Sequence, residues 1–522
     1  MLYPSRSLLR ALRPVCAAVA SLLAASAGHA ADDAQRVIVM FKPGAVAAGK
    51  AAVAAARGIV RHEIYGMDAV SIEVPSQALQ GLARNPNVEY VEPDEKRYLL
   101  ALDSPSTGSP YASGQRVPYG IGMVQADQLA GSDLSSRKLC IIDSGYDRAH
   151  EDLSSGSNVT GEYDSGTGWW YTDENHHGTH VAGTISALNN AGLGVVGVNA
   201  NATLKLHIVK VFDAAGWAYS SSLTTAANKC KAAGANIISM SLGGSRMVKT
   251  EQRAFDSLYS GGILSIAAAG NDGTSGFSYP ASYSSVVSVA AIDENKNWAS
   301  FSQYNSQVEI AAPGVGVLST VPMGAGSSSS LTVGGVAYVP GGMDGSPKAS
   351  VSAPLADFGL GGTASAGSMS GKVCLIQRGT YDFATKVSNC QASGGVGAVI
   401  YNNAAGSFGG TLGTTVTSIP SVTASDVEGA AMKSQLNQTA TLTVAASNYA
   451  YYDGTSMATP HVSAVAALVW ARNLNCTAAQ LRSSLNLSAL DLGPAGRDTK
   501  YGYGLVQAKA ADDRIKSRGC GK

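Results

Sequence analysis

The spacing of apolar residues changes along the first hundred positions, and each type of spacing predicts either a strand or a helix. Short apolar or alternating runs predict strands, and Ala-rich stretches predict helices. The predicted elements are strands at 37–41, 69–74 and 88–92 and helices at 45–57 and 77–83. Together they describe a small α+β unit with a polar tail at 93–97. A Ser/Gly/Pro-rich stretch, 103–114, follows it and predicts an exposed linker.

Three mostly apolar runs further along the chain, 138–142, 237–242 and 263–269, predict strands of a parallel sheet buried on both faces. Asp143 follows the first run and Asn271 follows the third. Because sites in α/β proteins lie at the carboxyl ends of such strands, both side chains are expected at one edge. The alternatives are an Asp that only caps the next turn and an Asn that only favours a turn beside Gly.

A small-residue apolar run at 462–470 predicts a buried helix, and Pro460 is expected in its first turn, where a missing N–H costs nothing. Ser456 then stands at the mouth of the helix, where its N–H and the helix dipole face a developing negative charge. An ordinary capped helix is the alternative. A serine nucleophile also needs a base and a group that orients the base.

Candidate bases cluster at one place, where three of the eight histidines lie within five residues: His176, His177 and His180. They precede a second small-residue helix. Metal ligation is an alternative for such a cluster, but no glutamate is spaced to complete a zinc motif.

The first thirty residues have the pattern of a signal peptide. Arg6, Arg10 and Arg13 precede an apolar run, 15–27, which is short for a membrane span, and small residues precede a cleavage point after Ala30. An uncleaved anchor is the alternative. We therefore expect a secreted, extracellular protein.

Export makes the cysteine count informative, because six cysteines remain beyond Cys16 and fifteen pairings are possible. Two pairs are favoured because each is isolated in its own region, and the third follows by elimination. The expected disulfides are Cys374–Cys390, Cys476–Cys520 and Cys140–Cys230.

The charge of the chain limits its expected partners, and its length limits the number of domains. Lys+Arg and Asp+Glu number 37 each, so no net field attracts nucleic acid or an anionic membrane, and neither is expected as a partner. With 522 residues the chain has room for two or three domains, and we expect a monomer.

Four motifs in one order resemble the signatures of the subtilisin-like serine proteases. They are Asp143 in IIDSGYD, His177 in HGTHVAGT, Asn271 in AAAGND and Ser456 in GTSMATPH. The resemblance implies an α/β fold, a parallel sheet with helices on both faces. It also implies Ser456 as nucleophile, His177 as base, Asp143 as the orienting acid and Asn271 as an oxyanion donor.

The resemblance further implies a broad endopeptidase that binds its substrate as an added strand and accepts large hydrophobic side chains at the cleaved bond. Ser278 is expected to close the apolar pocket, and Asp272 to lie at its rim. The alternatives are a narrow processing protease and an inactive binding protein. The implied substrate-binding residues are Ser241, Leu242, Gly243, Ala268 and Gly270.

Two features outside the motifs also follow from the resemblance. Residues 31–100 resemble an inhibitory propeptide, so the chain's partners are protein or peptide substrates and its own propeptide, cut at Leu100–Ala101. A structural calcium ion is implied, because oxygen donors suit calcium. The implied ligands are Gln115, Asp152, Leu188, Asn190, Leu193 and Val195.

After residue 100 the predicted domain boundaries divide the protease domain into two parts, 101–322 and 447–522. An insert at 323–446 separates them. The insert is Gly/Ser-rich from Met323, and elements beginning at 371 resemble a protease-associated (PA) domain. A bare spacer is the alternative. After a helix at 478–485, a short tail is expected to be held only by Cys476–Cys520.

Overall fold

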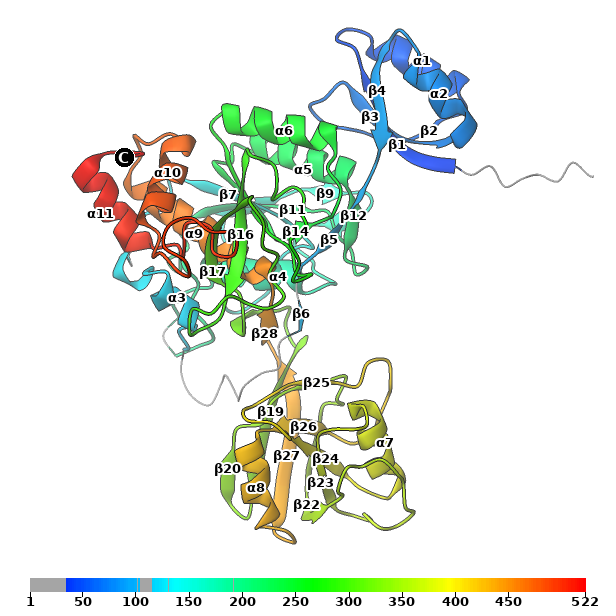
Figure 1. The fold of residues 1–522 in the computed structure, drawn as a ribbon, viewed down its shortest axis with the longest axis vertical. Coiled ribbons are helices and arrows are strands. Elements are labelled where there is room, and N and C mark those ends of the chain that lie inside the picture. The colour runs from blue at the N-terminus through cyan, green and yellow to red at the C-terminus, as the bar shows by residue number, and fades with distance from the viewer. Residues whose placement is uncertain (1–33, 101, 104–114, 130, 191) are drawn as a thin grey trace, which may run out of the picture.

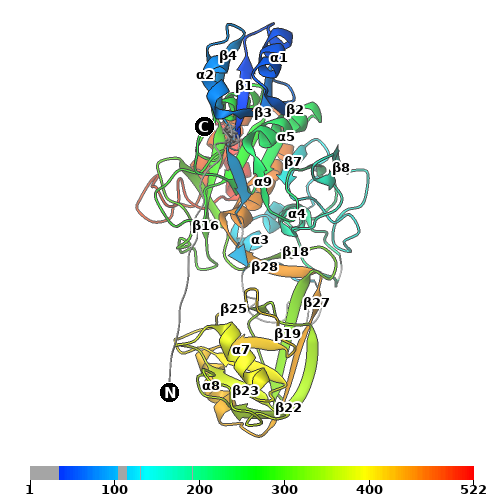
Figure 2. The same ribbon diagram turned by 90° about the vertical axis from the view of Figure 1, so that its right-hand side faces the viewer.

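The computed structural model describes residues 34–100, 102–103, 115–129, 131–190 and 192–522, the pair 102–103 as backbone only. The expected signal peptide and most of the expected linker lie outside these residues. The described chain forms an N-terminal unit, a central domain and an insert, arranged in a row (Figure 1, Figure 2).

The N-terminal unit is a four-stranded antiparallel sheet in the order β2-β3-β1-β4. The predicted strands and helices are present. The edge strand β2 was not predicted, because most of its side chains are exposed and it has no apolar run. The elements are β1 (Ala34–Phe41), α1 (Val46–Ala55), β2 (Ile59–Glu63), β3 (Ala69–Pro75), α2 (Leu79–Ala83) and β4 (Val88–Pro93).

The central domain is built on a seven-stranded sheet, in the order β17-β16-β15-β13-β7-β11-β8, in which every neighbouring pair is parallel. Its strands are almost wholly buried. This confirms the predicted fold class. The strands are β7 (Lys138–Asp143), β8 (Val159–Gly161), β11 (Lys205–Lys210), β13 (Ile237–Met240), β15 (Leu264–Ala268), β16 (Val286–Ile292) and β17 (Val308–Pro313).

Helices cover both faces of this sheet. On one face α4 (His177–Ser186) and α9 (Thr455–Arg472) share a core with the sheet, and on the other face α5 (Ser220–Ala232) and α6 (Lys249–Ser260) form a second core. Short helices and strands connect these layers. They are α3 (Tyr119–Met123), β9 (Tyr163–Asp164), β10 (Gly168–Trp169), β12 (Trp217–Tyr219), β14 (Leu242–Gly243) and β18 (Val317–Thr320).

Helix α9 begins earlier than predicted. It starts at Thr455, so Pro460 lies inside the helix and not in its first turn, and that prediction was wrong. Proline cannot donate to the carbonyl four residues before it, which here belongs to Ser456. The hydroxyl of Ser241 donates to that carbonyl instead, at 2.7 Å. The side chain of the residue between β13 and β14 thus supplies a donor in place of the missing backbone bond.

The insert is a folded domain throughout, so the bare-spacer alternative was wrong. Its sheet has the order β20-β19-β27-β22-β23-β24-β26, with α7 and α8 packed against it. The elements are β19 (Gly326–Val333), β20 (Val336–Tyr338), β21 (Met343–Asp344), β22 (Ala349–Asp357), β23 (Val373–Gln377), α7 (Phe383–Ala392), β24 (Gly397–Tyr401), β25 (Gly410–Thr411), β26 (Ser421–Ala424), α8 (Asp426–Lys433) and β27 (Thr439–Ser447).

The Gly/Ser-rich beginning of the insert is part of this sheet. Its serines belong to β19, in which Ser329 is buried and Ser327 and Ser330 are exposed, and β19 pairs with β27 along its whole length. Next to this pair, β18 pairs with β28 (Tyr449–Asp453), so the chain leaves and re-enters the central domain on adjacent strands. Composition alone concealed the strands, because serine is common in loops.

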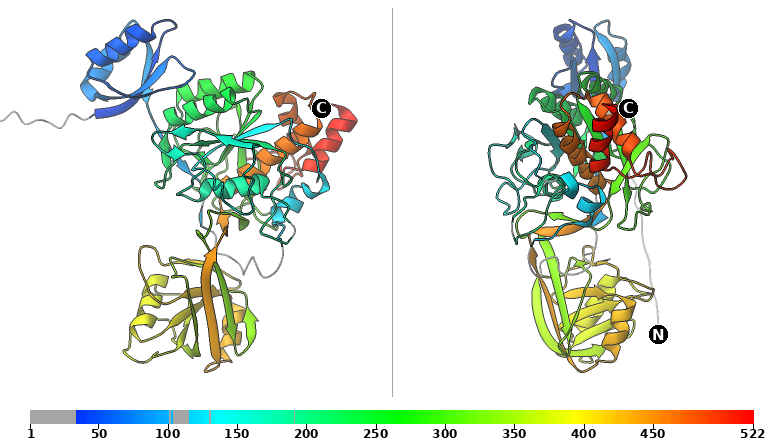
Figure 3. Two further views of the ribbon diagram at one scale, coloured as in Figure 1. Left: turned by 180° about the vertical axis from the view of Figure 1, so that it is seen from behind. Right: turned by 90° about the vertical axis from the view of Figure 1, so that its left-hand side faces the viewer.

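The C-terminal tail is also more ordered than expected. After α10 (Ala478–Ser488), a further helix, α11 (Ala508–Arg518), packs beside α9 and α10 (Figure 3). Ala511 and Ile515 are buried in the central core. The expectation that only a disulfide holds the tail was therefore wrong. The buried residues of α11, Ala508, Ala511, Asp512 and Ile515, lie on one face, and most other residues of the helix are charged.

All three expected disulfides, Cys140–Cys230, Cys374–Cys390 and Cys476–Cys520, are present. In the part of the chain that the structure describes, no helix combines the length and apolar character needed to cross a membrane.

The packing of α11 gives a first prediction. Replacing Ile515, which is 5% exposed, by Ala removes core contacts and should cost about 2–4 kcal/mol. The midpoint of thermal unfolding should fall by roughly 5–10 °C. Leu474→Ala, at a residue 59% exposed, is the matched control and should leave the midpoint nearly unchanged. Equal midpoints for both variants would mean that the tail contributes nothing to the core.

Candidate active site

The four motif residues meet at the carboxyl edge of the central sheet. Asp143 ends β7, His177 begins α4, Ser456 is the second residue of α9, and Asn271 follows β15. The Nδ1 atom of His177 lies 2.7 Å from Oδ1 of Asp143, and both side chains are buried. The pairing requires Nδ1 to carry the proton when the ring is neutral, which leaves Nε2 able to accept one.

The other two histidines of the cluster have different surroundings. His176 adopts a left-handed backbone conformation with φ 76° before α4. His180 is fully buried, stacks on Tyr452 and faces the carbonyls of Val317 and Ala450; burial lowers its pKa to about 3. Within the described residues no group of three His, Cys, Asp or Glu side chains could hold a metal.

A second buried carboxylate, Asp173, holds the Asp143–His177 pair in place, and sequence reasoning missed it. Its Oδ1 accepts from Ser144 Oγ at 2.8 Å and from the His176 N–H at 2.9 Å. Its Oδ2 accepts from the N–H and hydroxyl of Thr179 at 2.8 and 2.7 Å. The strand end that carries Asp143 is thereby tied to the first turn of α4. An acidic residue shortly before a helix was the available signal.

The hydroxyl of Ser456 is directed at the neighbouring strand. It donates to the carbonyl of Ser241 at 2.8 Å, and the Ser241 hydroxyl donates back to the carbonyl of Ser456. Nε2 of His177 is buried and has no hydrogen-bond partner among the described residues. Transfer of the Ser456 proton to His177 therefore requires the hydroxyl to turn away from Ser241.

The side-chain amide of Asn271 has a fixed orientation. Its Oδ1 accepts from the N–H and hydroxyl of Thr455, at 2.9 and 2.8 Å, so its Nδ2 faces the other way. There it donates to the carbonyl oxygen of Leu100 at 2.7 Å. Thr455, another residue that sequence reasoning missed, thus orients a donor toward a peptide carbonyl beside Ser456.

The tail of the N-terminal unit crosses the site as a strand, as predicted. Strand β5 (Lys96–Leu99) lies between β12 and β14 and pairs with Leu242 and Gly243 on one side and with Trp217–Tyr219 on the other. Beyond Leu100, strand β6 (Leu102–Asp103) pairs with β28. The segment on both sides of the expected cut is therefore extended and held by strand pairing.

A groove of about 550 Å³ lies beside this segment and includes Leu100, Gly243, Ser278 and Asp272 in its walls, as expected for the last two. Gln303 also lines it and was not predicted. Gly270 has φ 113°, and a Cβ there would lie 1.4 Å from Gln303 Oε1, so only glycine leaves room for that side chain. Ala268 is buried in β15 and is not among the residues that line the groove.

Comparisons with known proteins agree with this arrangement. Residues 135–357 match the subtilase family, residues 347–432 the PA domain, and residues 33–94 the fervidolysin N-terminal prodomain. Subtilisin DY of Bacillus licheniformis is 42% identical over 217 residues, 40% of this chain and 76% of that protein.

The chain belongs to the subtilase family. It is a serine endopeptidase with a prodomain and a PA domain. Subtilisin amylosacchariticus of Bacillus subtilis subsp. amylosacchariticus is 34% identical over 331 residues, 61% of this chain and 81% of that protein.

Two solved structures resemble this subtilase. The psychrophilic subtilisin-like protease Apa1 of Pseudoalteromonas sp. AS-11 is 44% identical with a TM-score of 0.63, covering 78% of this chain and all of that one. Fervidolysin of Fervidobacterium pennivorans has a TM-score of 0.60 over 92% of this chain and 61% of that one; at 24% identity it supports the fold alone.

Acidic residues hold the prodomain of this subtilase on two helix N-termini. Glu92 accepts from the N–H groups of Lys249 and Thr250 at the start of α6, and Asp94 accepts from the Ser221 N–H at the start of α5. Next to them Arg97 and Glu251 form a fully buried ion pair at 2.7 Å. Carboxylates are favoured at helix N-termini, where N–H groups lack partners inside the helix.

Five of the six predicted calcium ligands gather in one place. Gln115 Nε2 donates to the carbonyls of Leu188 and Val195, at 2.8 and 3.3 Å, and Asp152 accepts from Asn190 at 2.9 Å. Leu193 has its N–H bonded to Asn190, but no contact of its carbonyl joins it to the set. Burial raises the pKa of Asp152 to about 7. The set is rich in oxygen and includes the buried Asp152 carboxylate, which forms no salt bridge with a described Lys or Arg, so it fits calcium.

The contacts of Asp173 give a second prediction. In Asp173→Asn the new amide N–H₂ faces a backbone N–H, of His176 or of Thr179, that can only donate, so the first turn of α4 shifts and with it His177. For the processed enzyme kcat on a peptide should fall about 10- to 100-fold with KM little changed, since positioning acts on the chemical step.

The control for this variant is Asp133→Asn, an exposed carboxylate that accepts only from Ser135. It should leave both constants unchanged. The pH dependence of kcat/KM separates positioning from general damage, because the titration that limits it at low pH should shift in Asp173→Asn alone. A raised KM with unchanged kcat would contradict the assignment.

Proposed function

We propose that this subtilase is a secreted endopeptidase that first cuts its own chain after Leu100 and then cleaves other proteins with a broad preference for large hydrophobic residues before the cut bond. The observation that carries the proposal is the hydrogen bond from Asn271 to the Leu100 carbonyl in a segment held as a strand on both sides. The Leu100 carbonyl therefore has the surroundings that we expect for the carbonyl group of the peptide bond that is cut.

In the proposed reaction Ser456 attacks the carbonyl carbon, and His177 takes the proton from its hydroxyl. Asp143 holds the ring in the tautomer that accepts this proton and stabilises the charged ring that forms. The leaving amine then receives the proton from His177. Water repeats the sequence on the acyl-enzyme and releases the acid.

The negative charge that develops on the carbonyl oxygen is proposed to be stabilised by two donors. One is Nδ2 of Asn271, oriented by Thr455, and the other is the N–H of Ser456, which at the second position of α9 has no acceptor within the helix. Both donors are positioned before the reaction begins, so little reorganisation is needed as the charge forms.

Substrates are proposed to bind as β5 does, with Ser241, Leu242 and Gly243 pairing with the residues before the cut bond. The pocket near Gly270 and Ser278 then takes the side chain that Leu100 supplies in the precursor. Leu100 Cδ1 lies 3.0 Å from the position of a Cβ on Gly243, so even one added carbon there would crowd the bound leucine. A small, mostly uncharged wall favours apolar side chains.

The cut prodomain is proposed to remain as an inhibitor, held by Glu92, Asp94 and the buried Arg97–Glu251 pair. We assign residues 1–30 to a signal peptide, 31–100 to the propeptide, 323–446 to the PA domain, and 101–322 and 447–522 to the protease domain. The enzyme is proposed to act as a monomer without nucleic acid or membrane as partner.

Calcium is proposed as a structural cofactor held by Gln115, Asp152, Asn190 and the carbonyls of Leu188 and Val195, with Leu193 as a further candidate. When bound, the ion supplies the positive charge that the buried Asp152 carboxylate lacks and ties the N-terminal end of the mature chain to the 188–195 loop. It takes no part in the chemical step.

Self-processing gives the third prediction and tests the proposed function. Ser456→Ala, purified from a protease-free refolding, should stay as an uncut chain, because no nucleophile faces the Leu100 carbonyl. The wild type should yield a chain that begins at or near Ala101. Sequencing of both N-termini measures this, and Ser463→Ala, a buried serine of the same helix, is the control that should still mature. Maturation of Ser456→Ala would refute the proposal.

Calcium removal gives the fourth prediction. Chelation should shorten the lifetime of the mature enzyme at elevated temperature, because an ion bound only by the native state stabilises it by mass action. Inactivation rates are measured with and without chelator in metal-stripped buffer, and added calcium should restore the lifetime. Asp152→Asn should remove the difference between the two conditions. Identical wild-type rates in both would rule out a structural calcium ion.

A further inference from the structure

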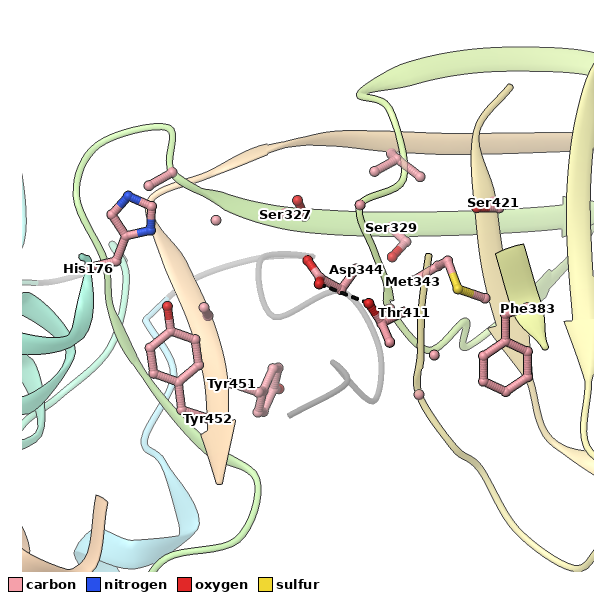
Figure 4. Close-up of a pocket in the computed structure, with 18 of the residues that line it drawn as sticks. His176, Ser327, Ser329, Met343, Asp344, Phe383, Thr411, Ser421, Tyr451 and Tyr452 are labelled. Atoms are coloured by element: carbon pink, nitrogen blue, oxygen red, sulfur yellow. Dashed lines mark hydrogen bonds between the residues drawn. The ribbon is translucent and has the colours of Figure 1, made fainter. Parts of the chain in front are cut away.

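A second cavity, of about 720 Å³, lies where the insert meets the central domain (Figure 4). One wall comes from the central domain, with Asn175 and His176 next to His177, and from Tyr451 and Tyr452 of β28. The opposite wall comes from the insert, including β19, β21 and β25. The cavity therefore begins beside the candidate active site and ends in the PA domain.

The strand pairing of the precursor leads into this cavity. Leu102 lies opposite Asp453 and Asp103 opposite Tyr452 in the antiparallel pair of β6 and β28. A chain that continues in the same register meets Tyr451 next and then Ala450, and both line the cavity. Counted from the bond after Leu100, the peptide residues that lie opposite Tyr451 and Ala450 are the fourth and fifth on the leaving-group side.

The two walls differ in charge. Among the described residues that line the cavity, Asp344 alone carries a full charge at neutral pH. Figure 4 shows its carboxylate between Tyr451 on one side and Ser329 and Thr411 on the other. Thr411 donates to it at 3.1 Å, which leaves the second carboxylate oxygen available. The hydroxyl of Tyr451 interacts with Arg116 of the central domain.

We propose that this cavity binds the leaving-group side of protein substrates from the fourth residue after the cut bond, and that Asp344 favours Lys or Arg there. The inference rests on the proposed function. A cationic side chain from an extended peptide that pairs with β28 can reach the carboxylate while the aromatic ring of Tyr451 lies along its stem. The PA domain then acts as part of the substrate-binding surface, next to the catalytic residues.

The enzyme's own chain provides an internal control. No Lys or Arg occurs between residues 101 and 115, so the first cut in the precursor makes no use of such a contact. A charge change at Asp344 should therefore alter the choice among other substrates without a parallel change in the rate of maturation.

The test uses quenched fluorescent peptides with one sequence up to the cut bond and Lys, Ala or Glu at the fourth and fifth positions after it. In the mature wild type, kcat/KM at low ionic strength should be about three- to fivefold higher for Lys than for Glu, as for a partly exposed ion pair. Asp344→Asn should bring this ratio close to one, and Asp344→Lys should invert it.

The ratio compares peptides of equal length within one variant, so a general loss of activity cancels. Asp357→Asn, an exposed carboxylate of the same insert outside the cavity, should keep the wild-type ratio. An unchanged ratio in Asp344→Asn, or no preference in the wild type, would overturn the proposal. A peptide that ends two residues after the cut tests the proposed function separately, since its hydrolysis needs the triad but not the cavity.

Discussion

The backbone hydrogen bonds of one chain segment, residues 96–99 and 102–103, connect the N-terminal unit of this subtilase to its central domain. On one side of Leu100 the segment is the middle strand between β12 and β14, and on the other side it is an edge strand on β28. Strand pairing does not depend on side-chain identity. The same groove can therefore hold the prodomain tail and, under the proposed function, accept unrelated proteins.

The contacts that are particular to the prodomain come from side chains around these strand pairs. The prodomain adds carboxylates on two helix N-termini and a buried ion pair, which a short substrate does not provide. A buried pair of this kind adds little net stability, but it is costly to break from one side only. The prodomain is thus held by groups outside the cleft, and the cleft itself can remain permissive.

Sequence patterns predicted the parallel sheet and the four motif residues, because strand ends and short motifs depend on local order. The three disulfides were predicted from the isolation of two cysteine pairs and by elimination for the third. They did not predict the roles of Asp173, Thr455 or Gln303. Each of these side chains acts on a residue that is distant in the chain, respectively Ser144, Asn271 and Gly270. Helix α11 and strand β19 were missed for another reason. Their burial depends on partners, α9 and β27, that composition does not identify, and the position of Pro460 depended on a hydroxyl from Ser241.

The insert joins the protease through two adjacent antiparallel pairs, β18 with β28 and β19 with β27. Its two ends are therefore neighbours, and closing them with a tight turn would keep the order of every strand in the central sheet. In evolutionary terms such a module can be gained or lost at the tip of a single hairpin. The same two-stranded stalk ends at Asp453, three residues before Ser456, so a displacement of the stalk would act on the chain segment that leads into α9.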